Sequence, residues 1–267
     1  MHMTPNRLFH YQTFKEEHLV SLLSEGKLKL SRPDQFNDPW DCRVHYQVPM
    51  DSAGRERAID HWKELNRKHY PHITEAKRAI MAYDIKSNPS KLEVALAKTE
   101  AILYEFLCNQ YRIYCLSEKP DVALMWGHYA GAHTGVCLEF DAKRAPFAGA
   151  AKVKYLSAYP AYDIVAGDAY DSLFTKSADW SYEAEWRLIA EERAFARSSR
   201  TIKTDNDFLM IPSGVLKSIT MGCLTDKSAQ RLIQNIIKTN APSVLVRKAT
   251  LARDRYGLVI TPPFYDV

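Results

Sequence analysis

Nine consecutive residues with strictly alternating side chains constrain the fold of this chain most. In Trp180–Leu188 every even position is apolar and every odd position is polar. Period-two alternation is typical of a β-strand with one buried face. We therefore predict a strand here, with Glu183, Glu185 and Arg187 projecting together from its other face. Such a strand requires a sheet and a further layer that covers it.

The polar face of this predicted strand has two interpretations. It is either a solvated face whose charges neutralise one another, or a pair of carboxylates held in a cleft. In the second case Arg187 would orient one carboxylate or an anionic ligand. Both interpretations stay open at this point.

Other segments show where the remaining elements lie. We expect helices at about 15–24, 123–130 and 227–238, and strands at about 7–11, 27–31, 112–117, 136–140, 152–156, 217–221, 244–247 and 257–260. Gly26 is expected to cap the first helix. A helical block at about 52–110 is expected, with breaks at Pro71 and Asn88-Pro89. Because the helices separate the strands unevenly, we predict an α+β fold. It would be one domain over 1–267, with a mixed central β-sheet and an inserted helical layer.

Composition and missing motifs exclude several classes of function. The five cysteines form no CxxC pair, so we expect neither a disulfide framework nor a structural zinc site, and no metal. The GxGxxG, GxxxxGK[ST], GxSxG and HExxH motifs are absent. No apolar run reaches the ~20 residues that cross a bilayer, and no signal peptide is evident. We expect a cytoplasmic protein without a membrane partner. Its net charge of +4 is compatible with an anionic ligand or nucleic acid.

A proline-rich loop after the second predicted strand combines polar and aromatic residues. Its residues Ser31, Arg32, Phe36, Asn37 and Asp38 lie between a strand and Trp40. Asn37 and Asp38 suit an Asx turn, in which they accept hydrogen bonds from nearby backbone amides. The aromatic side chains would anchor the loop in the core or stack on a ligand ring.

Histidine and aromatic residues mark two more segments. His128 and His133 are five residues apart, which is not the i,i+4 spacing of a helical metal pair. Trp126, His128 and Tyr129 are expected in the core or behind a site. His10 ends the opening strand beside Tyr11, and a lone histidine of this kind is most often structural.

Taken in order, these segments resemble a family of bacterial proteins known as the domain of unknown function (DUF) 2971 family. The matching segments are FHY, LKLSRPDQFNDPWD, CLSEKPDVALMWGHYAGAHTGVCLEFD, VKY, a lone Lys176 and WSYEAEWRL. They extend from the N-terminal region to about Leu188. The family name implies no activity.

A weaker resemblance is to the ADP-ribosyltransferase fold. FHYQTFKEEHLVSLLSEGKLKLS is similar to the opening of DNA-modifying transferases of that fold, and Glu183-Ala184-Glu185 is similar to a two-glutamate ExE motif. The resemblance implies NAD as a substrate. Glu185 would hold the ribose, Glu183 would orient an acceptor or act as a base, and His10 would hydrogen-bond the ribose or diphosphate. The other residues expected to contact the nucleotide are Tyr11, Ser31, Arg32, Phe36, Asn37, Asp38, Ser117, Trp126, His128, Tyr129 and Arg187.

The sequence therefore favours an NAD-consuming, ADP-ribosyltransferase-like enzyme. It would be a toxin or phage-defence effector that modifies protein or nucleic acid. This hypothesis expects His10, Ser117 and Glu185 to line one cleft. Two alternatives remain open. One is a non-catalytic binding or regulatory module of a defence system. The other is a metal-dependent nuclease that uses Asp38, Asp41, Glu183 and Glu185.

Overall fold

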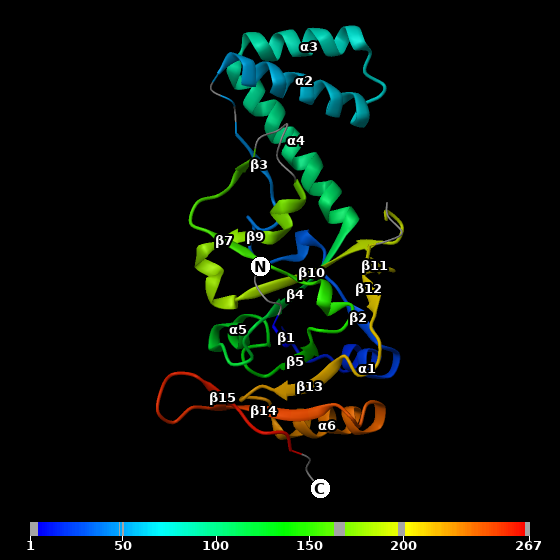
Figure 1. Ribbon diagram of the computed structural model, residues 1–267, viewed down its shortest axis with the longest axis vertical. Coiled ribbons are helices and arrows are strands. Elements are labelled where there is room, and N and C mark those ends of the chain that lie inside the picture. The colour runs from blue at the N-terminus through cyan, green and yellow to red at the C-terminus, as the bar shows by residue number, and fades with distance from the viewer. Residues whose placement is uncertain (1–4, 48, 50, 163–168, 197–200, 265–267) are drawn as a thin grey trace. The chain divides into compact units, whose positions relative to one another are not determined.

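A computed structural model describes residues 5–47, 49, 51–162, 169–196 and 201–264. The chain divides into two compact units (Figure 1). The sheet unit consists of Met1–Gln35, Gln110–Val153 and Asp179–Val267, and the helical unit consists of Phe36–Asn109 and Lys154–Ala178. The single domain expected from the sequence stays a prediction.

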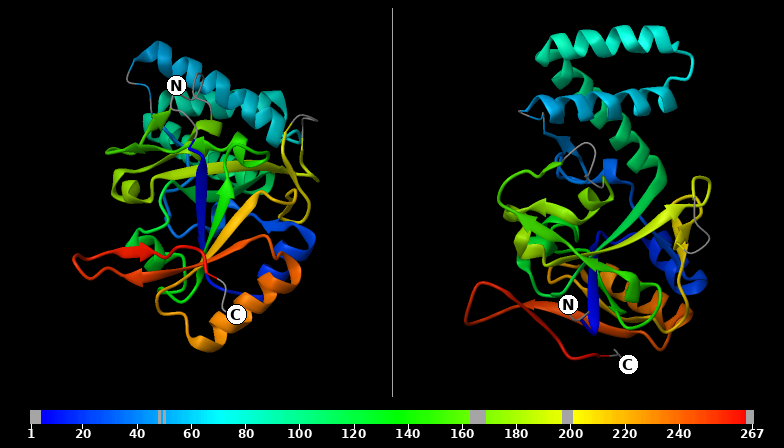
Figure 2. Two further views of the ribbon diagram at one scale, coloured as in Figure 1. Left: turned by 60° about the horizontal axis from the view of Figure 1, so that its bottom comes forward. Right: turned by 45° about the horizontal axis from the view of Figure 1, so that its top comes forward.

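A mixed sheet is the centre of the sheet unit and confirms the expected α+β class (Figure 2). In the described residues it runs in the order β11-β10-β4-β1-β5-β13-β14-β15, and β6 also pairs with β10. The pairs β10–β11 and β13–β14 are parallel, and the others are antiparallel. The strands are β1 (Arg7–Gln12), β4 (Tyr111–Ser117), β5 (Val136–Asp141), β6 (Ala151–Lys152), β10 (Glu185–Glu192), β11 (Lys203–Thr204), β13 (Leu216–Met221), β14 (Leu245–Leu251) and β15 (Leu258–Ile260). A separate pair joins β2 (Lys27–Lys29) to β12 (Phe208–Met210).

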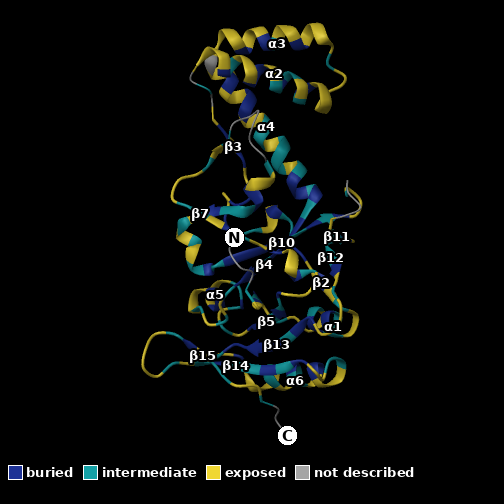
Figure 3. Ribbon diagram, in the orientation of Figure 1, coloured by how far each residue is buried: buried dark blue, intermediate teal, exposed yellow. Residues whose placement is uncertain are grey.

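Helices cover both faces of this sheet. The largest core cluster joins α1 (Glu16–Glu25) and α6 (Lys227–Asn240) to one face, through residues such as Leu138 and Trp186. A second cluster joins α5 (Ala123–His128) to Tyr11 and Cys137. Neighbouring residues of a strand project to opposite faces, so these clusters define an α1/α6 face and an α5 face. Figure 3 shows the buried strands between them.

Local signals in the sequence fix the ends of the helices. Asp226 accepts a hydrogen bond from the amide of Ala229 at the start of α6, over 2.8 Å. Gly26 closes α1 in a left-handed conformation with φ of 70°, as predicted. A Cβ atom at Gly26 would lie 2.6 Å from the carbonyl oxygen of Ile211, so any larger residue would also clash.

The helical unit contains the predicted helical block. Its helices are α2 (Ser52–His69), α3 (Glu75–Ser87) and α4 (Pro89–Gln110), whose last residue belongs to the sheet unit. The side chains of Asp51 and Thr74 cap α2 and α3. The side chain of Asn88 accepts a hydrogen bond from the amide of Ser90 in the first turn of α4. The helices bury Ala58, Trp62, Ile85 and Leu96 together. Two short parallel pairs complete the unit, namely β3 (His45–Tyr46) with β8 (Ala161–Tyr162) and β7 (Lys154–Leu156) with β9 (Thr175–Ser177).

The strand predicted over 180–188 is wrong in its first half. Residues Ala178–Glu183 form the 3₁₀ helix η4, Ala184 takes a left-handed φ of 45°, and β10 begins only at Glu185. The amide of Ala184 closes the turn on the carbonyl of Ser181 over 3.2 Å. Trp180 and Tyr182 are two residues apart, a spacing that is possible in a strand and in a 3₁₀ helix. The alternation of apolar and polar residues therefore could not reveal this turn.

Candidate functional site

Glu185 lies in a row of residues that crosses three strands. It is opposite Ser117 on β4, which is itself opposite Phe9 on β1. Residues directly opposite each other project from the same face, and Phe9 packs in the α5 cluster. Glu185 and Arg187 therefore project from the α5 face, at the end of β4 and the start of β10.

Glu185 and Arg187 form a buried bidentate ion pair. The Arg187 Nε and Nη2 atoms donate to Glu185 Oε1 and Oε2 over 2.8 and 3.1 Å. The side chains are 3% and 0% exposed for Glu185 and Arg187. The solvated-face interpretation is therefore wrong for these two residues. Because desolvating two charges costs several kcal/mol per ion, the bidentate geometry offsets part of the cost of burying this pair.

Glu183 reaches the same region from η4. Its carboxylate accepts a hydrogen bond from the Tyr129 hydroxyl over 2.6 Å, and its carbonyl accepts one from the Ser117 hydroxyl over 2.6 Å. Ser117 Oγ in turn accepts the amide of Lys119 over 3.1 Å. The left-handed turn at Ala184 thus lies between two buried carboxylates, those of Glu183 and Glu185, and Glu183 does not belong to β10.

Tyr11 and Trp126 brace the loop that follows Ser117. The Tyr11 hydroxyl donates to the carbonyl of Lys119 over 2.7 Å, and Trp126 Nε1 donates to the carbonyl of Pro120 over 2.9 Å. Their rings meet edge to face at 5.4 Å. Burial, with smaller contributions from neighbouring acidic groups, raises the pKa of Tyr11 far above its ordinary value. Both residues belong to the packed α5 cluster.

Four aromatic rings contact one another in the segments that carry Tyr129 and Glu183, and sequence reasoning identified only two of them. His128 and Tyr129, at the end of α5, were expected, whereas Trp180 and Tyr182 of η4 were assigned only to the apolar side of a strand. His128 contacts Trp180 and Tyr129 with ring centroids 6.2 and 6.1 Å apart. The Trp180 and Tyr182 centroids are 6.1 Å apart. Aromatic residues next to the carboxylates were the signal available in the sequence.

His10 lies on the opposite face of the sheet from Glu185. It follows Phe9, so it projects away from the α5 face, and it is opposite the core residue Leu138. Its ring stacks on Tyr114 at 4.0 Å, and Nδ1 is 2.7 Å from the carbonyl oxygen of Cys115. Burial lowers the pKa of His10 to about 4, although the hydrogen bond to Cys115 acts against this. His10 is therefore neutral at pH 7, and Nδ1 donates to the carbonyl. The structure does not place it beside Ser117 and Glu185.

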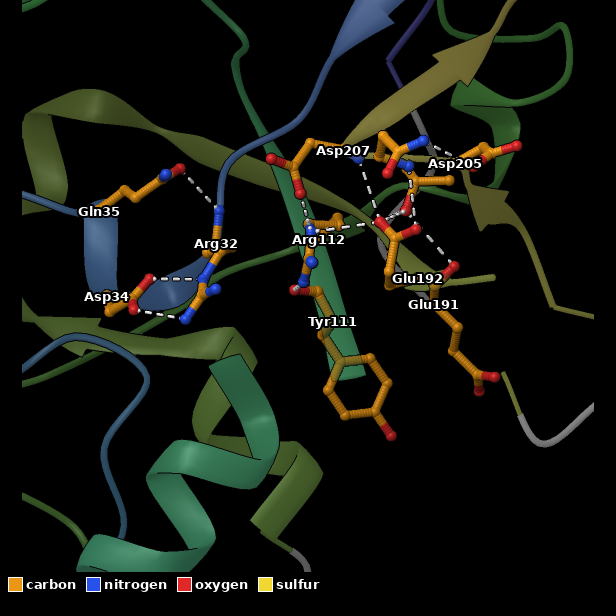
Figure 4. A network of polar contacts seen from close by, with 11 residues as sticks. Arg32, Asp34, Gln35, Tyr111, Arg112, Glu191, Glu192, Asp205 and Asp207 are labelled. Atoms are coloured by element: carbon orange, nitrogen blue, oxygen red, sulfur yellow. Dashed lines mark hydrogen bonds and ion pairs between the residues drawn. The ribbon is translucent and has the colours of Figure 1, made fainter. Parts of the chain in front are cut away.

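Ser31 and Arg32 lie beside the first half of β4. The backbone of Ser31 pairs with Ile113. Arg32 forms a bidentate ion pair with Asp34 over 3.1 and 2.8 Å (Figure 4). Its amide also donates to the side chain of Gln35 over 3.1 Å. The Arg32 guanidinium is thus engaged by a carboxylate of its own loop.

A buried network that the sequence did not reveal holds the hairpin between β11 and β12 (Figure 4). Glu192 accepts the Thr204 hydroxyl over 3.0 Å and the amides of Asn206 and Asp207 over 3.0 and 3.1 Å. Arg112 lies 3.4 Å from Glu192 and also donates to Asp207. Because Asn206 and Asp207 are both left-handed, this network stabilises a tight turn. It forms no part of the carboxylate site.

Phe36, Asn37 and Asp38 belong to the helical unit. Asp38 accepts the amide of Trp40 over 3.0 Å, which confirms the Asx turn expected for it. In the same unit Lys176 Nζ lies 3.8 Å from Asp41 Oδ2, with both side chains buried. Asp41 also accepts the Cys42 thiol over 3.3 Å. This pair brings together two segments that the sequence separates by more than a hundred residues.

Searches for a metal site and a membrane span give two further findings. Among the described residues, no group of three or more His, Cys, Asp or Glu side chains is arranged to hold a metal ion. None of the helices in that same part of the chain is long and apolar enough to cross a membrane.

Comparison with protein families gives one match. Residues 125–188 match the family described as "Protein of unknown function (DUF2971)", which confirms over this stretch the resemblance expected from the sequence. The matched residues include the end of α5, all of η4 and the first half of β10. Neither the curated proteins nor the solved structures gave a match.

Proposed function

We propose that this chain is an NAD-consuming enzyme of the ADP-ribosyltransferase type, with a related fold. Its acceptor would be a protein or nucleic acid, as in a toxin or phage-defence effector. The observation that supports the proposal most is the pair of buried carboxylates, Glu183 and Glu185, on either side of the left-handed Ala184. Buried carboxylates are costly, and such groups concentrate at functional sites.

The chemistry requires a carboxylate next to the ribose. When the bond between the ribose C1′ atom and nicotinamide breaks, nicotinamide leaves with the electron pair and positive charge develops on the ribose. A preorganised carboxylate stabilises that charge without reorganising during the reaction. Glu185 is assigned this role because the Arg187 fork fixes both of its oxygens.

Glu183 is assigned the second role, that of a base. An acceptor hydroxyl, amine or water molecule forms the new bond to C1′ and loses a proton, which a carboxylate can take. The hydrogen bonds from Tyr129 and Ser117 fix the side chain and the backbone of Glu183. His10 is omitted from the proposed machinery, because it projects from the other face of the sheet.

Release of nicotinamide from NAD by the purified chain tests this function. The expected result is release by the native chain and a loss of ~100- to 1,000-fold in Glu185→Gln, the cost typical of losing a preorganised group. Glu183→Gln should reduce transfer to the acceptor, so a second variant is informative if the first one unfolds. Glu17→Gln, on the exposed surface of α1, is the matched control and should behave as the native chain.

The fully paired ion pair favours one alternative, a non-catalytic binding module in which these charges only hold the loops. Absence of nicotinamide release, together with a lower melting temperature in Glu185→Gln, would support that alternative and contradict the proposal. Degradation of DNA or RNA that requires magnesium would instead favour a nuclease.

A further inference from the structure

A second group of charged side chains lies on the α5 face of the central sheet. It takes one side chain from each of four neighbouring strands, in the order β1, β5, β13 and β14. These side chains are Arg7, Glu139, Ser218 and Arg247, and we call them the arginine cluster. The pairing of the strands brings them together, because they are far apart in the sequence.

Strand register puts all four side chains on one face. Glu139 lies opposite Phe9 on one side and opposite Ser218 on the other. Phe9 projects from the α5 face, so Glu139 and Ser218 do as well. Arg7 precedes Phe9 by two residues. Arg247 lies opposite the residue that is two beyond Ser218 on β13. Because side chains two apart on a strand share a face, both arginines belong to the same surface.

The arginine cluster is distinct from the carboxylate site. Glu139 and Glu185 lie in one row of opposed residues, which passes through Phe9 and Ser117. They are three strands apart, and a spacing of roughly 4.8 Å between neighbouring strands separates their backbones by about 14 Å. A ligand group at the cluster therefore does not need Glu185.

Both arginines contact the same carboxylate, each through its Nε atom. Arg7 Nε lies 3.3 Å from Glu139 Oε1, and Arg247 Nε lies 3.9 Å from Glu139 Oε2. The Ser218 hydroxyl donates to the same Oε2 atom. Glu139 thus holds two guanidinium groups next to each other.

Most donors of these two arginines make no hydrogen bond. Within the part of the chain that the structure describes, the Arg7 side chain donates none. Arg247 donates one, from Nη1 to the carbonyl of Thr261 over 3.3 Å. Its Nε atom is buried and has no hydrogen-bond partner among those residues. Buried donors are nearly always satisfied, so this atom requires an explanation. The Arg7 and Arg247 side chains are 45% and 26% exposed, and a ligand from solution can therefore reach them.

The arginine cluster has an excess of positive charge. Glu139 supplies a single negative charge for the guanidinium groups of Arg7 and Arg247. Beside them, Lys217 Nζ lies 3.4 Å from Asp141 Oδ2, so the charges of that pair offset each other. The whole chain also has a net charge of +4. An anion is therefore the class of ligand that this surface favours.

We propose that the arginine cluster binds a phosphate group through the Nη donors of Arg7 and Arg247. A guanidinium fork matches the geometry of phosphate oxygens, and a phosphate group has enough oxygens for two forks. Glu139 positions the forks and does not contact the ligand. The phosphate group belongs either to a small phosphorylated molecule or to the backbone of a nucleic acid. The inference is independent of the proposed enzyme activity.

Titration calorimetry of the full chain at low ionic strength tests the inference with two probes. Inorganic phosphate represents the free group, and a short single-stranded DNA without terminal phosphates represents the backbone. Tighter binding of inorganic phosphate assigns the site to small phosphorylated molecules, whereas tighter binding of the DNA assigns it to a nucleic acid. Absence of binding with both probes would overturn the inference. Because neither probe is NAD, the result does not depend on nicotinamide release.

Four variants locate the binding of the tighter probe. Arg7→Gln and Arg247→Gln should each weaken it at least tenfold, because each removes charge-assisted hydrogen bonds. Glu139→Gln should strengthen it, because a negative charge near the ligand is removed. The matched control is Arg231→Gln, on the exposed surface of α6, which should bind as the native chain does. Weakening in Glu139→Gln or in the control as large as in the arginine variants would contradict the inference.

Discussion

The sheet unit and the helical unit each contain a deeply buried ion pair, and these two pairs differ in geometry and in origin. In the sheet unit, Arg187 and Glu185 are two residues apart on one strand and share two hydrogen bonds of 2.8 and 3.1 Å. In the helical unit, Lys176 and Asp41 come from distant segments, and the closest approach of their charged atoms is 3.8 Å. All four side chains are at most 5% exposed.

The difference shows what holds each charge in place. The planar guanidinium of Arg187 fits both carboxylate oxygens, so that pair is directional and fixed by its own strand. The Lys176 ammonium is a point charge that contacts Asp41 loosely, and Asp41 has a further contact with the Cys42 thiol. We therefore expect the first pair to be much more sensitive to substitution than the second.

The largest effect is expected from breaking the directional pair. Arg187→Met removes the bidentate partner of the buried Glu185, and we expect the free energy of unfolding to fall by about 3–5 kcal/mol in urea titrations. Arg187→Lys keeps the charge but loses the fork, so it should be intermediate. A loss below about 1 kcal/mol in Arg187→Met would show that this ion pair contributes little to stability.

A smaller effect is expected in the helical unit. Lys176→Met should lower the free energy of unfolding by about 2 kcal/mol, a smaller loss because its ion pair with Asp41 is longer and Asp41 keeps its thiol donor. Adding Asp41→Asn should restore part of that loss, because a neutral amide then replaces the buried carboxylate. If Lys176→Met lowers the free energy of unfolding as much as Arg187→Met does, the geometry of the two ion pairs does not determine how much each contributes to stability.

The smallest effect is expected from His10, whose imidazole is neutral at pH 7 in the folded state. Burial lowers the pKa of His10 to about 4 in the folded state, against ~6.5 in an unfolded chain. Between these values the unfolded state binds more protons, so stability falls as the pH falls from about 6.5 to about 4. From pH 7 to pH 5.5 we expect His10 to account for a loss of about 1 kcal/mol.

His10→Asn provides the control for this pH dependence. Its side-chain amide can occupy the place of Nδ1 and donate to the carbonyl of Cys115, but it does not titrate. Free energies of unfolding at several pH values should therefore change less with pH in the variant than in the native chain. An identical pH dependence in both proteins would show that folding does not lower the pKa of His10.

Much of the secondary structure follows from the sequence. Alternation and helical spacing predicted β1, β4, β5, β13 and the helices to within a few residues, because side-chain periodicity reflects which face is buried. Gly26 as the cap of α1 and the break at Asn88 follow from backbone preferences. The proximity of Glu185 and Arg187 was also predictable, since residues two apart on a strand share a face.

Tertiary structure alone decided which side chains share a site. The left-handed turn at Ala184 separates Glu183 from β10, and Tyr129 then reaches its carboxylate. Strand register places Phe9, and not His10, on the face of Glu185. A shift of one residue in that register would have reversed this choice, because neighbouring side chains of a strand point in opposite directions. A sequence specifies the period of each strand, but only the packing of the whole unit fixes how strands align with one another.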